Sequence, residues 1–282
     1  MRSGLAIRAP DHLGDATMAI PAIRGLAALG GVVHGPRFLP ALFEAVGLVG
    51  VEIRGVDEVP GEGTGVLLKP SFGAAWRWRH LARRIGISEQ GRGFLLTDAL
   101  PILANEHRRD GYDRVARAAG AEVARGAVPS SRRSGFVALN PWSPSSTVRW
   151  PGFRALADQL VANGLEVRFF AGPGEEAAVS ALAGPHAVEA GLPLLAFARA
   201  LAGAALFVSN DSGAAHFADA VGVPVLVIHG STDPALTGVG GAVTGGPIWC
   251  GPCYRKTCIL GLTCLTRISP EVVVGAVLAR LG

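Results

Sequence analysis

Short apolar runs alternate along the chain with longer segments whose apolar residues recur every three or four positions. The short runs predict β-strands, and the longer segments predict amphipathic helices. In the first half, the predicted strands are Leu5–Ala9, Val32–His34, Val51–Arg54 and Val66–Lys69. The predicted helices of that half are Ala16–Leu29, Pro40–Val46, Ala74–Ile85 and Asp110–Ala119.

The same alternation begins again after a polar, turn-forming stretch at 129–135, which predicts a linker. The predicted strands of the second half are Phe136–Asn140, Val167–Ala171, Leu206–Ser209 and Val223–His229. Its predicted helices are Pro151–Asn163, Glu175–Leu182, Leu194–Gly203, Gly213–Val221 and Pro270–Leu281.

Strands that are apolar throughout and separated by helices indicate parallel sheets covered on both faces. We therefore predict an α/β fold with two doubly wound domains, residues 1–130 and residues 131–282, that face a central cleft. The last helix, at 270–281, has a second predicted placement, in which it packs back on the first domain. Ligands of such sheets bind beyond the carboxyl ends of the strands, so the loops there are the places to look for function.

Composition narrows the protein class. Of the 282 residues, 49% are hydrophobic and 17% charged, which excludes a disordered chain. The net charge of +4 is too small to indicate a nucleic-acid partner. The longest apolar stretch, 190–208, is interrupted by Pro193 and Arg199, and the N-terminus lacks the pattern of a signal peptide. We therefore expect a cytoplasmic protein.

The first informative loop runs from Ala9 to Asp15. A carboxylate at the start of the following helix can accept the proton of an attacking hydroxyl, so Asp15 is a candidate general base. A helix N-cap is the alternative role for the same residue. Asp11 and His12 lie close by in the sequence and are alternative candidates for the general base.

Two loops of the second half suit a diphosphate. Residues 140–151 combine four hydroxyls with one guanidinium before a helix, and a flexible turn is the alternative. Residues 208–216 lead from a strand through small polar residues into a helix, which favours an anion pocket. The candidate ligands in these loops are Ser143, Ser145, Ser146, Thr147, Arg149, Asp211, Ser212, Gly213 and His216.

Weaker signals come from two other strand ends. Glu175 follows a strand and a glycine turn, where an acidic residue can bind ribose hydroxyls or simply complement the helix dipole. His229 ends an apolar strand and is interpreted as a core histidine. Sequence patterns typical of P-loop nucleotide hydrolases, α/β-hydrolases, zinc proteases and dinucleotide dehydrogenases are missing.

Taken together, the loops resemble glycosyltransferase family 9, the ADP-heptose:lipopolysaccharide heptosyltransferases, and above all its heptosyltransferase II branch. The resemblance extends over nearly the whole chain. It is carried by the order and spacing of segments rather than by any one of them. These segments are Leu13–Arg24, Leu67–Phe72, Arg84–Gly86, Phe94–Asp98, Val208–His216, Gly222–Val225 and Gly230–Pro234.

The resemblance implies a GT-B fold of two Rossmann-like domains, with the acceptor bound by the first and the nucleotide-sugar by the second. It implies inverting, metal-independent transfer of a heptose from ADP-heptose to a lipopolysaccharide inner core, with Asp15 as the base. The diphosphate would lie on residues 211–216, and Glu175 would lie near the adenosine. The acceptor candidates are His12, Lys69 and Arg77, and Trp76, Trp78 and Arg79 are grouped with them.

The sequence departs from the family pattern in two ways. Val148 stands where the family usually has a lysine near the donor phosphates, and Arg149 is its candidate replacement. The first half is also short for the family, so the acceptor could differ from a standard inner core. Two alternatives follow: the same fold using another nucleotide-sugar or a non-lipid acceptor, or a nucleotide-sugar-binding protein without catalysis.

Four cysteines fall close together near the C-terminus, at Cys250, Cys253, Cys258 and Cys264. Four thiols at this spacing could hold a structural zinc, form local disulfides or remain reduced. The heptosyltransferase II branch has a similar cysteine-rich segment, and inverting transfer gives it no catalytic part. Arg255 and Lys256, within this segment, could face an anionic acceptor lipid, which would imply peripheral contact with the inner membrane surface.

Overall fold

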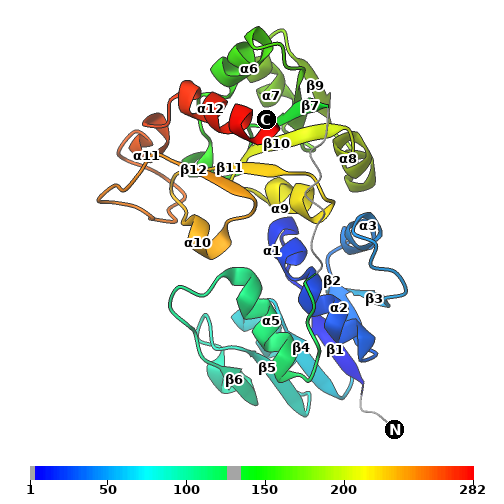
Figure 1. Cartoon of the computed structure of the whole chain (residues 1–282). Coiled ribbons are helices and arrows are strands. Elements are labelled where there is room, and N and C mark those ends of the chain that lie inside the picture. Colours follow the sequence, from blue (N-terminus) through cyan, green and yellow to red (C-terminus); the bar gives the residue numbers. More distant parts are fainter. Residues whose placement is uncertain (1–3, 126–134) are drawn as a thin grey trace. The chain divides into compact units, whose positions relative to one another are not determined.

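The computed structural model describes residues 4–125 and 135–282. The chain forms two compact units, residues 1–127 and residues 128–282 (Figure 1). Most of the linker predicted at 129–135, together with the predicted domain boundary at 130, lies outside the described residues.

The first unit contains a parallel sheet in the order β3-β2-β1-β4-β5-β6. Its strands are β1 (Leu5–Arg8), β2 (Val32–Gly35), β3 (Ile53–Gly55), β4 (Thr64–Leu67), β5 (Arg83–Ile87) and β6 (Asp98–Leu100). Its helices are α1 (Leu13–Met18), α2 (Ile20–Ala28), α3 (Leu39–Ala45), α4 (Phe72–Arg77) and α5 (Arg108–Ala118), with a 3₁₀ turn, η1 (Gly93–Leu95).

The second unit repeats this plan in the order β12-β11-β10-β7-β8-β9. Its strands are β7 (Phe136–Asn140), β8 (Val167–Ala171), β9 (Ala187–Ala190), β10 (Ala204–Asn210), β11 (Val225–His229) and β12 (Gly241–Thr244). Its helices are α6 (Phe153–Ala162), α7 (Glu176–Ala183), α8 (Leu194–Leu201), α9 (Gly213–Ala220), α10 (Pro234–Thr237), α11 (Thr263–Thr266) and α12 (Pro270–Leu281), with a 3₁₀ turn, η2 (Ser146–Val148).

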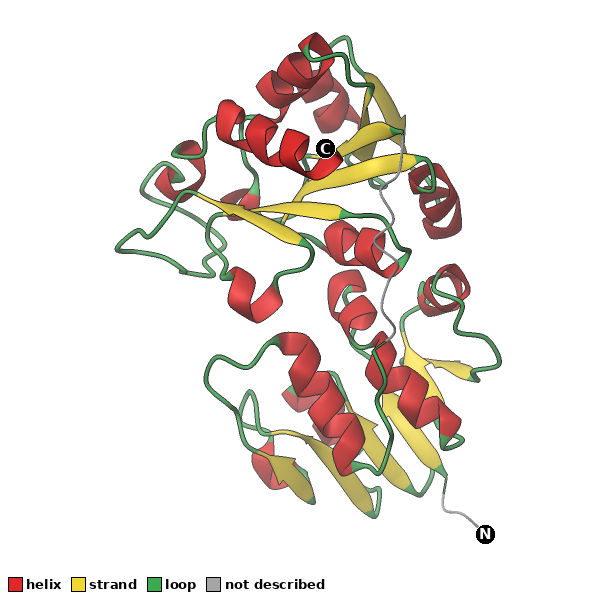
Figure 2. Ribbon diagram, viewed as in Figure 1, coloured by secondary structure: helices red, strands yellow, loops and turns green. Residues whose placement is uncertain are grey.

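Alternation along the central strands builds a core on each face of the second sheet. In β7, Val137 and Leu139 join the buried side chains of α6, α7 and α12. Phe136 and Ala138 join those of α8 and α9 on the opposite face. Figure 2 shows these helices on both sides of the sheet. Because β7, β10 and β11 are buried along their whole length, the predicted α/β fold with parallel, doubly covered sheets is confirmed.

The last helix contributes its apolar side to this same core. Val273, Val274 and Val277 of α12 are buried with Leu156 and Leu160 of α6. The helix is thus an integral layer of the second unit.

Two predicted helices of the first half are wrong in extent. The segment 16–29 forms two helices, α1 and α2, with a break at Ala19, because Pro21 has no amide hydrogen to continue the hydrogen-bond ladder. The predicted helix 74–85 ends at Arg77, and Arg83–Ile87 is strand β5 instead. Ile85 and Ile87 of β5 are buried, and the strand pairs with β4 on one side and β6 on the other. This tertiary pairing overrides the helical spacing of apolar residues in the segment.

Smaller differences occur at element ends. Helix α6 begins at Phe153 after a Gly152 N-cap, not at Pro151 as predicted. The short strands β6, β9 and β12 lie at sheet edges and carry few buried residues. They have no apolar run from which the sequence could predict them.

Candidate active site

Each sheet reverses its strand order at one point, and several candidate residues of each unit follow the strands on either side of that point. In the first unit the reversal lies between β1 and β4, and in the second between β7 and β10. Connections leave these neighbouring strands toward opposite sides, which opens a crevice beyond their carboxyl ends where ligands bind. Asp15 follows β1 and Lys69 follows β4, whereas the serine-rich loop follows β7 and Asp211 follows β10.

Asp15 lies in the first turn of α1, but its carboxylate does not cap the helix. The N-cap position is occupied by His12, and Asp15 Oδ1 accepts a hydrogen bond of 2.8 Å from the Tyr112 hydroxyl of α5. Within residues 4–125 and 135–282, no donor is bonded to Asp15 Oδ2. The N-cap interpretation is therefore wrong, and one carboxylate oxygen is left to accept a substrate proton.

Tyr112 is buried and acts as a fixed donor. Burial raises the pKa of Tyr112 well above its ordinary value, and the Asp15 carboxylate adds to this effect, so the phenol keeps its proton. Arg108, one turn earlier on α5, pairs with Glu89 at 3.1 Å. Burial lowers the pKa of Arg108, but Glu89, together with Tyr112 and Asp15, outweighs this effect and raises that pKa above its ordinary value, so the guanidinium stays charged.

Asp11, the competing carboxylate, is occupied by ion pairs. Its Oδ1 accepts from Arg8 at 2.6 Å, and its Oδ2 accepts from Lys69. Burial would raise the pKa of Asp11, but the hydrogen bonds from Lys69 and Arg8 outweigh it and place that pKa below its ordinary value. A carboxylate with both oxygens bonded and a lowered pKa is a poor base, so the geometry favours Asp15 over Asp11.

Buried Arg92, which the sequence analysis did not single out, ties this edge of the sheet together. Its guanidinium donates to the carbonyl oxygens of Leu67, Lys69 and Ile87, at the ends of β4 and β5. Burial lowers the pKa of Arg92 to about 10, which leaves it charged at neutral pH. A Cβ at Gly86 would lie 2.8 Å from Arg92 Nη2, so the close approach requires glycine there.

The three acceptor candidates have different surroundings. His12 is exposed at the start of α1, and Lys69 pairs with Asp11. Arg77 is exposed and bonds to Asp57, with Nη1 3.1 Å from the carboxylate and Nη2 3.3 Å from the carbonyl oxygen. The structure thus brings Lys69 and His12 to the loop that carries Asp15, but the contacts of Arg77 lie in the β3–β4 connection. The acceptor role of all three stays a prediction.

In the second unit, the serine-rich loop forms the 3₁₀ turn η2 rather than a flexible turn. Thr147 is buried, its hydroxyl lies 2.8 Å from Ser145 Oγ, and it donates to the carbonyl oxygen of Arg255 at 2.6 Å. Ser146 is exposed at the start of the turn. Thr147 therefore serves first as an anchor between two loops, and Ser145 and Ser146 are the hydroxyls nearer to solvent.

Arg149 folds back over its own loop. Its guanidinium carbon lies 3.5 Å from the centre of the Trp142 ring, and Nε donates to the Ser143 carbonyl oxygen at 2.5 Å. The preceding Val148 is buried. Stacking and hydrogen bonding hold the Arg149 guanidinium in one orientation. Some of its five N–H donors are used within the loop, and the others can still bind a ligand.

Two buried amide side chains fix the strand ends near the serine-rich loop: Asn210 joins the loop after β7 to the end of β10, and Asn140 joins the end of β7 to β8. Asn210 Nδ2 donates to the Pro141 carbonyl oxygen at 2.6 Å, and Asn210 Oδ1 accepts from the Trp150 amide at 2.9 Å. Asn140 Nδ2 donates to the Phe170 carbonyl oxygen at 3.1 Å. Each amide satisfies backbone groups that would otherwise be buried without partners. The 141–150 loop is thereby held against the end of β10.

Ser212, and not Asp211, caps α9. Its hydroxyl accepts from the Ala215 amide at 3.4 Å and lies 3.0 Å from Ser209 Oγ. Gly213 is the first residue of the helix, and His216 is buried within its first turns. The early amides of α9 thus point beyond the carboxyl end of β10, where the sequence places a diphosphate.

Asp211 instead faces the end of β11. Its Oδ2 accepts from the Thr237 hydroxyl at 3.3 Å and lies 3.8 Å from His229 Nδ1. His229 is 2% exposed and also contacts Thr232 Oγ1 at 3.2 Å. Its Nε2 is buried with no hydrogen-bond partner among the described residues. His229 is thus a buried core side chain, as predicted, and its Nδ1 also lies near the Asp211 carboxylate.

We expect stability to depend on pH through His229. Burial lowers the pKa of His229, and the carboxylates of Asp211 and Asp233 oppose this effect without cancelling it. The unfolded state binds a proton more readily, so the contribution is present above about pH 6.5 and is lost as pH falls through the folded-state pKa. Melting temperatures are measured at several pH values between about 7.5 and about 5. As the pH falls, they should decrease less steeply for His229→Gln than for the wild type. His34, whose pKa burial also lowers, contributes equally to both proteins. Parallel curves would contradict the expectation.

Glu175 uses one oxygen within its own turn. Oε2 accepts from the Gly172 amide at 2.8 Å, and the residue occupies the N-cap position of α7 without capping it by its side chain. The turn is therefore rigid, and contact with a ribose stays a prediction for the other oxygen.

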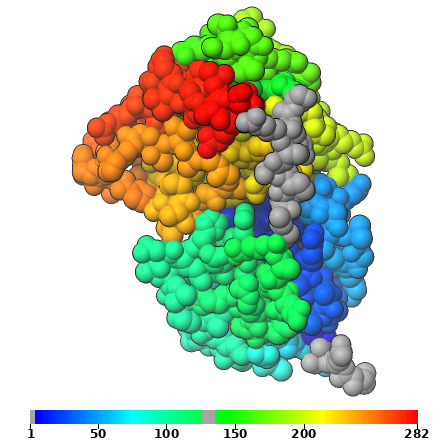
Figure 3. Space-filling view, viewed as in Figure 1, coloured from blue at the N-terminus to red at the C-terminus, as the bar shows by residue number. Residues whose placement is uncertain are grey.

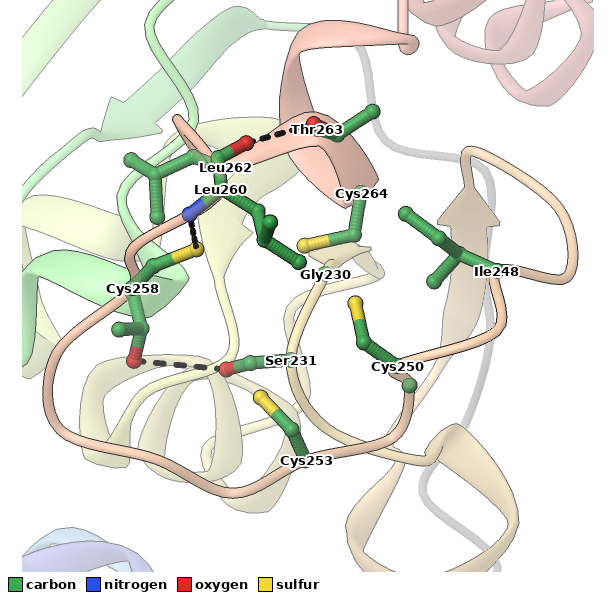
Figure 4. A pocket seen from close by; sticks show the side chains of 12 residues that line it. Gly230, Ser231, Ile248, Cys250, Cys253, Cys258, Leu260, Leu262, Thr263 and Cys264 are labelled. Atoms are coloured by element: carbon green, nitrogen blue, oxygen red, sulfur yellow. Dashed lines mark hydrogen bonds between the residues drawn. The ribbon is translucent and has the colours of Figure 1, made fainter.

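The four cysteines surround one small cavity (Figure 4). The cavity holds about 20 Å³, and the four sulfur atoms face it from the loop after β12 and from α11. All four thiols are free, and burial raises the pKa of Cys264. Within residues 4–125 and 135–282, no three His, Cys, Asp or Glu side chains come close enough together to hold a metal ion. A zinc site there stays a prediction that would need side-chain movement.

Tyr112, Arg92 and Asn210 are the residues that sequence reasoning missed. Tyr112 lies 97 positions from Asp15, so no local pattern links the two. Asn210 stands within the 208–216 motif, but its neighbours are the predicted ligands. The available signal for Asn210 is that it ends, with Ser209, an otherwise apolar strand.

No helix in the described part of the chain is long and apolar enough to cross a membrane.

The sequence profile of glycosyltransferase family 9 (heptosyltransferase) matches residues 108–263. Lipopolysaccharide heptosyltransferase 1 of Pseudomonas aeruginosa is 32% identical over an alignment of 149 residues, and the match covers 44% of this chain and 42% of that protein. The aligned part thus spans less than half the length of this relative.

Solved structures of similar fold cover the whole chain. E. coli ADP-heptose lipopolysaccharide heptosyltransferase II aligns with a TM-score of 0.71 at 20% identity, over 99% of this chain and 98% of that one. The family 9 glycosyltransferase of Veillonella parvula aligns at 0.72 and 19%, over 99% and 97%. E. coli heptosyltransferase WaaC, solved with ADP, aligns at 0.72 and 16%, over 99% and 100%. These likenesses confirm the predicted GT-B fold.

The profile covers α5 with Tyr112, the serine-rich loop, the Asp211–His216 segment and the first three cysteines, and Asp15 lies before it. Because it spans more than half of the sequence, the chain belongs to glycosyltransferase family 9.

Proposed function

We propose that this protein transfers a heptosyl group from ADP-heptose to a sugar hydroxyl of a lipopolysaccharide inner core, with inversion at the anomeric carbon and without a metal. The observation that carries the proposal is the Asp15 carboxylate, held by Tyr112 at the carboxyl end of β1 with one oxygen unbonded among the described residues. The named relatives support the choice of donor and acceptor.

The first unit supplies the base. Tyr112 fixes the Asp15 carboxylate by one oxygen, so little reorganisation is needed when the other oxygen meets a hydroxyl. The charged Lys69 and Arg108 lie near this loop and suit an acceptor that carries anionic groups.

The second unit supplies the donor site. The early amides of α9 and the hydroxyls of Ser145 and Ser146 suit the two phosphates of ADP. Arg149, oriented by the Trp142 ring, adds a positive charge on the same edge of the sheet. The buried Asn210 holds these two loops together through its hydrogen bonds to Trp150 and Pro141.

The reaction is a single displacement. The acceptor oxygen forms a bond to the anomeric carbon while the bond from that carbon to the ADP oxygen breaks, and the electron pair leaves with ADP. The hydroxyl proton passes to Asp15 Oδ2. Charge that develops on the departing phosphate is stabilised by the α9 amides and by Arg149.

Binding of the donor nucleotide is the first test. A ligand at 100 times its Kd adds about 2.7 kcal/mol to the folded state, so saturating ADP should raise the melting temperature by several degrees. UDP, GDP and dTDP at the same concentration serve as matched controls. A shift with ADP alone is expected and leads to turnover assays with ADP-heptose. A larger shift with another nucleotide would replace the donor, and the lack of any shift would indicate a degenerate donor site.

A further inference from the structure

A long acid-free stretch crosses the surface of the second unit. Between Asp233 and Glu271 the sequence has no acidic residue, yet it contains Arg255, Lys256 and Arg267. We name the part between β12 and α11, residues 245–262, the basic loop. It extends from the sheet edge in Figure 1 and forms an outer margin of the molecule in Figure 3, where it is orange.

The basic loop exposes large apolar side chains beside its charges. Trp249 is 86% exposed and Ile259 is 89% exposed, and Tyr254 and Leu260 are also exposed. No carboxylate in the described part of the chain pairs with the Arg255 or Lys256 side chain. Aromatic and aliphatic groups next to unpaired cations are the combination that binds the interface of an anionic bilayer.

The middle of the loop is fixed to the body of the second unit, so the exposed residues near it are presented without a large ordering cost. The amides of Cys253 and Tyr254 each donate to the Ser231 carbonyl oxygen at 3.0 Å, and Thr147 Oγ1 donates to the Arg255 carbonyl oxygen at 2.6 Å. Thr147 and Ser231 are both buried. The loop is therefore connected directly to the 3₁₀ turn η2 of the candidate donor site.

We infer that the basic loop is a docking surface for an anionic phospholipid bilayer. Trp249 and Ile259 enter the interfacial region, while Arg255 and Lys256 contact lipid phosphates. A second copy of the chain fits this surface less well, because a symmetric contact would bring like charges together. The inference deepens the proposed function and rests on it, because the proposed acceptor is a glycolipid and would be located in a bilayer.

Vesicle co-sedimentation tests the inference without donor, acceptor or turnover. The full chain is mixed with vesicles of phosphatidylglycerol and phosphatidylcholine, or of phosphatidylcholine alone, at low and high salt. We expect binding to the anionic vesicles, which high salt weakens. Each cation near such a surface contributes about fivefold in affinity, so the double variant Arg255→Gln/Lys256→Gln should bind roughly 30-fold more weakly. Trp249→Ser should bind about tenfold more weakly.

Matched controls lie in the first unit. Arg37→Gln/Arg117→Gln removes two exposed charges, and Val49→Ser removes an apolar side chain that is 82% exposed. These controls should bind vesicles like the wild type. An ADP-induced melting shift in every variant shows that the fold is intact, and it also separates failure of the docking surface from failure of the proposed donor site.

Three outcomes would overturn the inference: equal binding to neutral and anionic vesicles, no vesicle binding by the wild type, or an equal loss in the control variants. A change of oligomeric state in Trp249→Ser, with vesicle binding unchanged, would assign the surface to a protein partner and would also overturn it.

Discussion

Replacing Asp15 by Asn should lower kcat by about a thousandfold and leave the Kd for ADP within about twofold. The amide keeps the size of the side chain and can still accept from Tyr112 through its oxygen, but it cannot take up a proton at neutral pH. The proposed nucleotide contacts lie in the second unit, so we expect donor affinity to be unchanged. Turnover of ADP-heptose with a lipopolysaccharide acceptor gives kcat, and calorimetry gives the Kd for ADP.

Tyr112→Phe is the matched variant for this experiment. It keeps the ring and the base but removes the hydroxyl that orients Asp15, so we expect a loss in kcat of about tenfold, well short of that in Asp15→Asn. Asp11→Asn tests the competing carboxylate. If Asp11→Asn lost as much activity as Asp15→Asn, or if Asp15→Asn lost ADP binding in proportion, the assignment of Asp15 as the base would be wrong.

Arg92→Met should destabilise the first unit by about 3 kcal/mol. The guanidinium donates to three carbonyl oxygens, at Leu67, Lys69 and Ile87, and is 1% exposed. Methionine fills much of the space but leaves these buried acceptors without donors, and that loss exceeds the gain from no longer burying a charge. Urea unfolding, followed by the fluorescence of the buried Trp78, measures the effect.

Arg117→Met is the control for the loss of an arginine as such. Arg117 lies exposed on α5, and its replacement should change the free energy of unfolding by less than about 0.5 kcal/mol. ADP binding by Arg92→Met, measured below its unfolding transition, should be retained because the proposed donor-binding residues lie in the second unit. Equal stability of Arg92→Met and wild type would mean that water replaces the guanidinium at the three carbonyl groups.

The sequence by itself determined the fold class and the order of the candidate loops. The strands β7, β10 and β11 are buried on both faces, so each begins with an unbroken apolar run that the sequence displays, and the predicted bounds of β7 match those observed. Asp15, Asp211 and Ser212 could be chosen because each follows a strand of a parallel sheet, and such a sheet binds ligands beyond the carboxyl ends of its strands.

What only the tertiary structure decided is the set of partners for these residues. Tyr112 meets Asp15 across 97 positions, Asn210 meets Trp150 across 60, and Thr147 meets Arg255 across 108. A single hydrogen bond between distant residues has no periodicity that a sequence could display. The same holds for β5, whose pairing with β4 and β6 overrides the helical spacing of its residues. Local patterns record burial, whereas the assignment of a base, a cap or an anchor depends on which chain segments meet when the core closes.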